Sequence, residues 1–356
     1  MKGNTLTTRP TLLLTGGSGV LGQAIIDELS AGFDLVCLSH RTPVEDPRVA
    51  TFTGALTEPG LGLDRERLRA LAGSIDVVLH SAAVTSWRSS RETIFGTNVN
   101  GTQNMLDLAR LADARFYYVS TAFVARPPAA DQDDPDVAGL VAYVQSKMDA
   151  EELVRGSGPG HVIVRPPVVI GDSGTGRIAK FQGIHQMFGA LIQNAVPLIP
   201  AEPGSLIDVM PQDVVARAVG RLIGAEVIEG EYWLTAGGAA PTVADLVDIT
   251  VSIGEHLGHE VHRPRMLPAE AVDRLLIPLM EDVLPPGLRR RFGAFIQLMT
   301  LFQSERALPS SLPEIGLDVT MSHRGLLAAF RRSVEYWAVR TGLATEEHFE
   351  SSEAVA

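Results

Sequence analysis

Three glycines spaced three apart follow a short apolar run near the start of the chain, and they constrain the fold more than any other feature. Residues 11–15 read Thr-Leu-Leu-Leu-Thr, which is typical of a buried parallel strand. Gly16, Gly19 and Gly22 come next, and the apolar positions within residues 23–29 have helical spacing. Glycine is required where a backbone turns tightly and approaches a ligand closely. A strand, a glycine turn and a helix in this order predict a dinucleotide site with the pyrophosphate at the helix N-terminus, rather than an ordinary turn that binds nothing.

A tyrosine and a lysine four residues apart indicate what the dinucleotide is used for. Tyr143 and Lys147 lie in a helical pattern over residues 141–154, so both side chains project from one face. We expect the lysine to lower the tyrosine pKa from about 10 and to hydrogen-bond the nicotinamide ribose. A hydroxyl at the end of the fifth strand, Ser120 or Thr121, completes the predicted site by binding the substrate oxygen. These side chains predict a nicotinamide-dependent redox enzyme, because the cofactor carries the hydride and the protein supplies position and charge.

The end of the second strand bears on the choice of cofactor. Residues 34–38 form an apolar run that continues into Ser39-His40-Arg41, and no carboxylate stands there to take a ribose 2′-hydroxyl. Arg41, with His40 beside it, pairs instead with a 2′-phosphate, which favours NADP(H) over NAD(H). The alternative is that Arg41 is a solvated loop residue.

Strand and helix patterns alternate up to about residue 170. This alternation predicts an α/β protein with a Rossmann-type, doubly wound parallel sheet. Further strands are expected at residues 49–53, 76–80, 116–120 and 161–165, with helices at residues 64–71 and 91–112. Asp64 is the expected N-cap of the first of these helices.

Helices dominate after Gly171, which predicts a smaller, mostly helical C-terminal lobe that binds substrate. The expected helices cover residues 178–193, 213–223, 243–257, 269–280, 288–302 and 324–340, with short strands at 206–209 and 232–235. The predicted organisation is a flexible N-terminus (1–9), an NADP-binding domain (10–175), a substrate lobe with some strands returning to the core sheet (176–342) and a flexible acidic tail (343–356).

Composition narrows the class of protein and its expected partners further. The chain has 356 residues, a net charge of −12 and 45% hydrophobic residues, which allows a large core and disfavours nucleic acid or an anionic membrane as partners. A single cysteine, Cys37, falls in an apolar strand and is expected to be a buried, inert thiol. No apolar stretch reaches the length of a membrane span, and residues 1–9 lack a signal-peptide core, so a cytoplasmic location is expected. The sequence contains no cluster of His and Cys residues that would predict a metal site.

The order of several segments resembles an extended short-chain dehydrogenase/reductase. The segments are residues 15–22, His80-Ser81-Ala82-Ala83, Asn98-Val99-Asn100-Gly101-Thr102, Val119-Ser120-Thr121-Ala122-Phe123-Val124, residues 143–147 and Val164-Arg165-Pro166-Pro167. A narrower resemblance is to fatty acyl-CoA reductases and to the thioester reductase domains of carboxylic acid reductases and peptide synthetases, the group with a male-sterility-like NAD-binding domain. It is carried by residues 119–124, by residues 164–176 with Lys180-Phe181-Gln182-Gly183, and by residues 58–63. The likeness covers about residues 10–250.

The resemblance implies roles for particular residues. Thr121 takes the catalytic hydroxyl role, with Ser120 as second choice, beside Tyr143 and Lys147. Residues 81–83 approach the adenosine half of the cofactor, and Pro166 and Val168 line the nicotinamide pocket. With the residues argued above, the predicted cofactor-binding set is Gly16, Ser18, Gly19, Val20, Leu21, Gly22, Arg41, Ser81, Ala82, Ala83, Ser120, Tyr143, Lys147, Pro166 and Val168.

Members of this group reduce an acyl thioester, carried by coenzyme A or a carrier protein, to an aldehyde and in some cases to an alcohol. The chain contains no adenylation or carrier domain, so an acyl or peptidyl carrier protein would act in trans, or the substrate would be a coenzyme A thioester. Where the group often has Gly-Asp after the third strand, this chain has Gly54-Ala55, which implies a different contact to adenine.

Other functions stay open from the sequence. One is an alcohol or sterol dehydrogenase; another is a nucleotide-sugar epimerase or dehydratase, against which the apolar positions 188, 191, 192 and 196 argue; a third is a cofactor-binding regulator without turnover. Residues 284–302 combine three arginines with an apolar run. This segment could form an acyl-chain pocket or lid with a basic rim, a helix that lies on a membrane surface, or a helix of the core.

Overall fold

The structure is a computed structural model that divides into two compact units. It describes residues 9–39, 43–127, 138–158, 160–272, 274, 296, 299–317 and 321–350. Unit 1 comprises Met1–Val124, Ala142–Arg165 and Ala216–Tyr232. Unit 2 comprises Ala125–Val141, Pro166–Val215 and Trp233–Ala356. The predicted limits at residues 9, 175 and 342 stay predictions.

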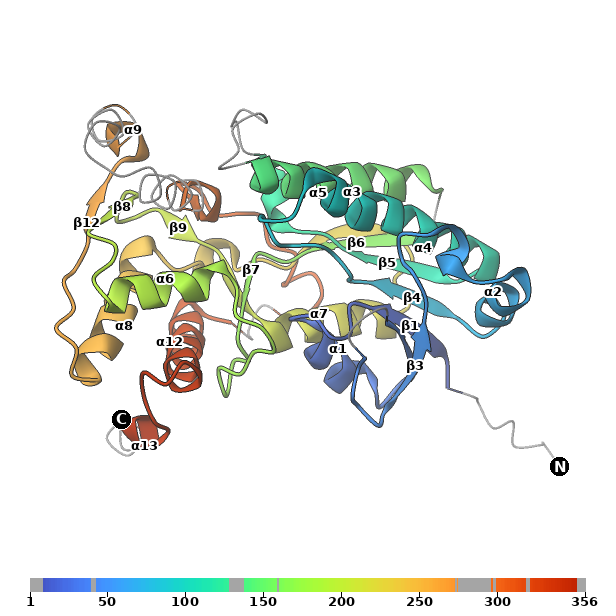
Figure 1. Cartoon of the computed structure of the whole chain (residues 1–356), viewed down its shortest axis with the longest axis horizontal. Helices are drawn as coiled ribbons and strands as arrows, with labels where there is room; N and C mark the ends of the chain where they lie inside the picture. Colours follow the sequence, from blue (N-terminus) through green and yellow to red (C-terminus); the bar gives the residue numbers. More distant parts are fainter. Residues whose placement is uncertain are drawn as a thin grey trace. The chain divides into compact units, whose positions relative to one another are not determined.

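Unit 1 is built on a seven-stranded sheet in the order β11-β6-β5-β4-β1-β2-β3 (Figure 1). The strands are β1 (Thr11–Thr15), β2 (Asp34–Ser39), β3 (Val49–Thr53), β4 (Val77–His80), β5 (Arg115–Val119), β6 (His161–Arg165) and β11 (Gly230–Trp233). The six strands from β1 to β6 pair in parallel. This order confirms the predicted doubly wound, Rossmann-type α/β fold.

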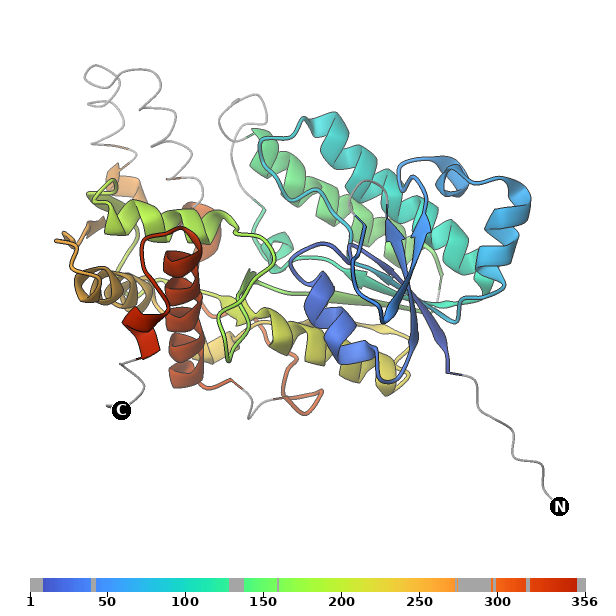
Figure 2. The same cartoon turned by 60° about the horizontal axis from the view of Figure 1, so that its bottom comes forward.

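Helices cover both faces of this sheet, as Figures 1 and 2 show. The helices α2 (Arg65–Ala72), α3 (Arg91–Phe95), α4 (Gly101–Ala112) and α5 (Ala138–Gly156) lie on one face, and α1 (Gly22–Leu29) and α7 (Gln212–Gly224) lie on the other. The central strands are therefore buried on both sides and consist of apolar runs, as parallel sheets require. Asp64 caps α2 as predicted, accepting a hydrogen bond from Arg67 N at 2.8 Å. Cys37 is fully buried, and burial raises the pKa of its thiol to about 12.

The helix predicted over residues 91–112 is interrupted. One turn of π-helix, Gly96–Asn100, separates α3 from α4. Single π turns occur mostly at functional sites, where the extra residue changes the direction of a side chain. Here the turn contains Asn98, whose side chain is buried and hydrogen-bonded on two sides. Hydrophobic spacing cannot reveal such an insertion, because both flanks keep a helical pattern.

Helices predominate over strands in the described part of unit 2, as predicted, but unit 2 is the larger of the two units rather than a smaller lobe. Its main helices are α6 (Gly183–Ile192), α8 (Val243–His256) and α12 (His323–Arg340), with the short α9 (Ala269–Ala271) and α13 (Glu347–Glu350). The three main helices lie against one another (Figure 2). Phe188 meets Phe330 edge to face at 5.1 Å, a favourable ring geometry.

The strands of unit 2 form three two-stranded pairs. β7 (Val168–Ile170) pairs with β10 (Val209–Pro211), β8 (Leu198–Pro200) with β12 (Arg265–Leu267), and β9 (Leu206–Ile207) with β13 (Gln303–Ser304). Of these, the sequence predicted only the segment at 206–209. Strands of two or three residues contain too few positions to show a period of two.

The start of one helix in this unit differs from the prediction. Helix α6 begins at Gly183 rather than at residue 178, because Gln182 N donates to His185 Nδ1 in a reciprocal cap at 3.1 Å. Of the helix predicted at 269–280, the structure describes α9 and a few residues beyond it. Most of the predicted helix at 288–302, with the arginines at 289–291, lies outside the described residues.

The motif over residues 171–176 has a structural explanation within unit 2. Asp172 Oδ1 accepts hydrogen bonds from Gly174 N and Thr175 N, which closes a tight turn. Gly176 has a φ of +69°, and a Cβ there would lie 2.1 Å from Arg332 O on α12. Glycine is therefore required because the loop packs directly on a helix backbone.

A buried carboxylate in unit 2 leads to a stability prediction. Asp208 is 7% exposed; its carboxylate accepts from Ala236 N at 2.9 Å, and burial raises its pKa to about 7. Because the folded-state pKa is raised, this contribution to stability is complete below pH 4 and is lost as pH rises through 7. We expect Asp208→Asn to remove about 2–3 kcal/mol of the fall in unfolding free energy between pH 5 and pH 8. Urea unfolding of both proteins at the two pH values measures this, and parallel pH dependences would contradict it.

Candidate active site

The predicted functional residues of unit 1 follow the carboxyl ends of three neighbouring strands. Gly16 follows β1, Ser81 follows β4, and Ser120 follows β5. The chain order of the strands reverses between β1 and β4. In open α/β sheets, ligands bind outside the carboxyl ends of the strands at this switch point.

The glycine turn at this position leaves no room for side chains. Gly16 has a φ of +81°, and a Cβ there would lie 2.8 Å from Ala82 N. A Cβ on Gly22 would lie 1.9 Å from Gly17 O, inside the turn itself. Gly17, absent from the predicted set, is equally constrained, since its Cβ would lie 2.8 Å from Cys37 Sγ. The turn also contains the predicted Ser18, Val20 and Leu21, with Gly19 N donating to Gly16 O at 2.9 Å.

A buried hydrogen-bond chain fixes the strand ends beside this turn. Thr15 Oγ1 accepts from Ser81 N at 3.2 Å and from Ala82 N at 3.1 Å, and lies 2.7 Å from His80 Nδ1. His80 Nε2 lies 3.1 Å from Thr102 Oγ1, which donates its proton to Asn98 O. The Thr102 oxygen must then accept from His80 Nε2–H, so Nδ1 accepts from the Thr15 hydroxyl. Burial and the nearby Lys147 charge lower the pKa of His80 to about 3, so the ring is neutral and its tautomer is set by this chain.

The catalytic side chains predicted from the sequence lie together in unit 1. Tyr143 and Lys147 stand one turn apart on α5, and both are buried. The Tyr143 hydroxyl is hydrogen-bonded to the side chain of Thr121, directly after Ser120 at the end of β5. Lys147 Nζ donates to Val119 O at 2.7 Å and lies 4.2 Å from the centre of the Tyr118 ring. The arrangement joins a proton donor, a second hydroxyl and a cation at one strand end.

The expectation that Lys147 lowers the pKa of Tyr143 is wrong for this structure. Burial raises the pKa of Tyr143 to about 12, and the hydrogen bond with Thr121 opposes this only in part. Burial also lowers the pKa of Lys147 to about 7, and its ammonium is bonded to the Val119 carbonyl. Tyr143 therefore keeps its proton at neutral pH and is suited to give that proton to a developing oxyanion.

Two observations fit a bound dinucleotide in unit 1. The glycine turn is packed so closely that a Cβ at Gly16, Gly17 or Gly22 would collide with neighbouring protein atoms, as the tight turn of a dinucleotide site requires. The Ser120 hydroxyl is buried without a hydrogen-bond partner in the described part of the chain. A buried hydroxyl of this kind costs free energy unless a ligand or water satisfies it.

Asn98 is a residue of this region that the predicted site set omitted. Its Oδ1 accepts from Val84 N at 2.7 Å, and its Nδ2 donates to Ser146 Oγ at 2.9 Å. Ser146 lies between Tyr143 and Lys147 on α5, so Asn98 connects the segment after β4 to the catalytic helix. In the sequence, Asn98 stands out only as a polar residue of a helical pattern and as part of the family motif at residues 98–102.

Three predicted residues are not placed beside this site. Pro166 and Val168 belong to unit 2, where Val168 N donates to Asp208 O at 3.2 Å, and their role at the nicotinamide stays a prediction. Arg41 and its neighbour His40 lie outside the described residues, as does the acidic loop over 131–136.

Within the described ranges, no group of three His, Cys, Asp or Glu side chains is arranged to hold a metal ion. No helix in the part of the chain that the structure covers is long and apolar enough to cross a bilayer.

The chain belongs to the male sterility protein family, whose model matches residues 38–219, about half of the chain. This confirms the resemblance to extended short-chain reductases and identifies the chain as an oxidoreductase with a nicotinamide dinucleotide-binding domain. A linear gramicidin synthase from Brevibacillus parabrevis is 25% identical over 344 residues, which cover 86% of this chain and 6% of the synthase. The chain spans 3% to 6% of the length of several such synthases and synthetases that it matches.

Solved structures share the fold. The terminal R domain from the myxalamid PKS-NRPS pathway has a TM-score of 0.70 at 22% identity, covering 96% of this chain and 93% of that domain. A thiolation-reductase di-domain from an archaeal non-ribosomal peptide synthetase has a TM-score of 0.68 at 17% identity, covering 94% and 76%. At these identities the likeness shows the fold alone, so the chemistry is argued from the site.

Proposed function

We propose that the protein is an NADPH-dependent reductase that transfers hydride to an acyl thioester to give an aldehyde or an alcohol. The observation that carries this proposal is the buried group of Tyr143, Thr121 and Lys147 at the end of β5. Family membership and the reductase domains among its relatives support the same reaction.

The residues divide the work as follows. Bound NADPH supplies the hydride. The hydroxyls of Tyr143 and Thr121 bind the thioester carbonyl oxygen and stabilise the negative charge that develops on it. Tyr143 then gives its proton to that oxygen. Collapse of the adduct returns that proton to Tyr143, restores the carbonyl and breaks the C–S bond, and the departing thiolate takes a proton from water to give the thiol. A Tyr143 pKa of about 12 suits the reduction of a carbonyl, since the phenol is protonated before each turnover and can donate its proton.

The choice of NADPH rests on the end of β2. Strand β2 ends at Ser39, at the edge where a carboxylate would otherwise take a ribose 2′-hydroxyl, and Arg41 follows two residues later. A guanidinium at that point pairs with a 2′-phosphate in bidentate geometry.

A small apolar pocket in unit 2 favours an apolar group over a sugar nucleotide. It lies between α6, α8 and α12. Its lining is Ile184, Met187, Phe188, Leu191, Ile199, Ile207, Val243, Leu246, Val247, Thr250, Met299 and Phe330. Such a lining offers almost no partner to a nucleotide diphosphate, which disfavours an epimerase or dehydratase. The thiolation-reductase neighbour supports a carrier-bound form of the thioester.

A substrate panel tests this function. NADPH oxidation is followed with acyl-coenzyme A and acyl-pantetheine thioesters of increasing chain length and with ketones as comparisons, and NADP⁺ reduction is followed with alcohols. We expect thioester-dependent oxidation that is faster with NADPH than with NADH and that increases with acyl length. Turnover of ketones or alcohols alone would replace the proposal with a dehydrogenase. Cofactor binding without turnover on any substrate, including a thioester loaded on a carrier protein, would indicate a regulator.

A further inference from the structure

Four side chains of α5 are spaced by one helical turn. Tyr143, Lys147, Glu151 and Arg155 follow one another at intervals of four residues, so they form one row along the helix. Tyr143, Lys147 and Glu151 are all buried. A carboxylate therefore stands one turn beyond the lysine, on the side opposite the tyrosine. The proposed reaction does not use it.

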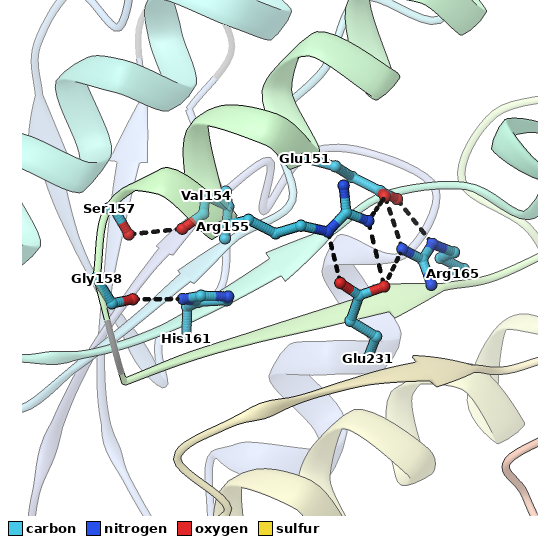
Figure 3. Close-up of polar contacts among 8 residues, drawn as sticks. All are labelled: Glu151, Val154, Arg155, Ser157, Gly158, His161, Arg165 and Glu231. Atoms are coloured by element: carbon cyan, nitrogen blue, oxygen red, sulfur yellow. Dashed lines mark hydrogen bonds and ion pairs between the residues drawn. The ribbon is translucent and has the colours of Figure 1, made fainter.

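Two arginines hold this carboxylate in place (Figure 3). Arg165, at the end of β6, makes a bidentate contact, with Nε to Oε1 at 2.8 Å and Nη2 to Oε2 at 2.6 Å. Arg155 adds a bond from Nη2 to Oε2 at 2.6 Å. Glu231, on β11, bonds the same two arginines from the other side. Bidentate arginine contacts fix a carboxylate in direction as well as in charge.

The other titratable groups around Lys147 are neutral near pH 7. His80 on β4 has a pKa of about 3, and burial raises the pKa of Tyr118 on β5 well above 10. Tyr143 also keeps its proton, and Val119 contributes only a carbonyl oxygen. Glu151 is the negative charge that acts on the lysine among these described neighbours, and it opposes the loss of charge that burial causes.

We propose that Glu151 is a positioning residue for Lys147, with Arg165 and Arg155 fixing its carboxylate so that the lysine stays cationic beside Tyr143. A buried ammonium is costly without a compensating charge, and this carboxylate supplies it across one helical turn. The significance of this role for turnover rests on the proposed function; the electrostatic role itself does not.

The chain offers an unusually clean measurement. It contains three lysines, Lys2, Lys147 and Lys180. In a K2R/K180R background labelled with [13C]lysine, the 13Cε resonance of Lys147 is the single lysine signal, and its titration gives the pKa directly in the whole protein. No substrate or cofactor is required.

Glu231→Gln is the matched control for Glu151→Gln. Both substitutions remove one carboxylate from the same two arginines, and only the first removes the charge next to Lys147. We expect E151Q to lower the Lys147 pKa from about 7 by about one unit or more, and E231Q to leave it within a few tenths. Equal shifts in the two variants, or a shift in neither, would show that the four-residue cluster only stabilises the fold.

Two further variants keep the test decisive if E151Q does not fold. E151Q/R165Q leaves neither member of the bidentate pair as an unpaired charge, and the same downward shift is expected. E151D keeps the charge and loosens the contacts, so its Lys147 pKa should stay close to that of the wild type. A shift as large in E151D as in the glutamine variants would overturn the proposal.

Activity supplies a separate readout. The fall of kcat at high pH, which reports loss of the Lys147 charge, should begin at lower pH in E151Q and be unchanged in E231Q. If the wild type reduces no thioester, the proposed function fails, while the resonance titration still decides the role of Glu151.

Discussion

Replacing Tyr143 by phenylalanine is expected to lower kcat by about 10²–10⁴-fold while nicotinamide dinucleotide binding stays close to that of the wild type. The substitution removes the proton donor and one of two hydroxyls on the carbonyl oxygen, and it keeps the buried ring on α5. Single-turnover kinetics with a thioester measure the first effect, and titration of protein fluorescence with NADPH measures the second.

Tyr117→Phe is the matched control. Tyr117 is buried on β5, and its hydroxyl donates to Val227 O, away from the catalytic group. We expect near wild-type turnover from this variant, with a small loss of stability from the unpaired carbonyl. A Tyr143→Phe protein that turns over as fast as Tyr117→Phe would refute the proton role of Tyr143.

Replacing Gly22 by alanine is expected to reduce the free energy of unfolding by about 3 kcal/mol and to weaken dinucleotide binding by about tenfold or more. The new Cβ would lie 1.9 Å from Gly17 O, so the start of α1 has to move away from the turn. That movement displaces the helix N-terminus that we expect to face the cofactor phosphates. Urea unfolding and NADPH titration measure the two effects.

Gly32→Ala provides the comparison for this variant. Gly32 lies just beyond α1, and a Cβ there meets no atom within 4 Å. Its stability and cofactor affinity should stay within about 0.5 kcal/mol of the wild type. Equal behaviour of the two alanine variants would mean that the turn tolerates a side chain and is not the phosphate site.

The sequence was sufficient for the fold of unit 1 because its signals are local and repeated. Most strands from β1 to β6 are apolar runs long enough to recognise, although β3 is largely exposed, and a helix follows most of them. Strand ends and helix faces also predicted that Tyr143 and Lys147 would meet a hydroxyl, either Ser120 or Thr121, and the family resemblance favoured Thr121. The short strands of unit 2 carried no comparable signal.

The electrostatics of the site could not be predicted from spacing. Tyr143 and Lys147 are neighbours as expected, yet burial has the largest effect on the pKa of each, so the tyrosine pKa rises instead of falling. Spacing gives the distance between two groups, whereas a pKa depends on every atom that excludes water from them. The same limit applies to His80, whose tautomer follows from two threonines distant in sequence.

Long-range polar partners were the other class of residue that the sequence concealed. Asn98 reaches α5 from a π turn, and Glu151 is fixed by Arg165 on β6. Each appeared in the sequence as an ordinary polar residue of a helix. Only the folded chain shows which polar groups they bind, because hydrogen-bond partners of buried groups are chosen by topology rather than by local pattern.

The central claim is that hydride passes to a thioester carbonyl with loss of the thiol. Incubation of the protein with [4,4-²H₂]NADPH and an acyl-pantetheine thioester, followed by mass spectrometry of the products, tests it most directly. The proposed reaction predicts deuterium at C1 of the aldehyde or alcohol and one free thiol for each acyl group reduced. Deuterium in a product that still carries its thioester, or oxidation of the cofactor with no thiol released, would contradict it.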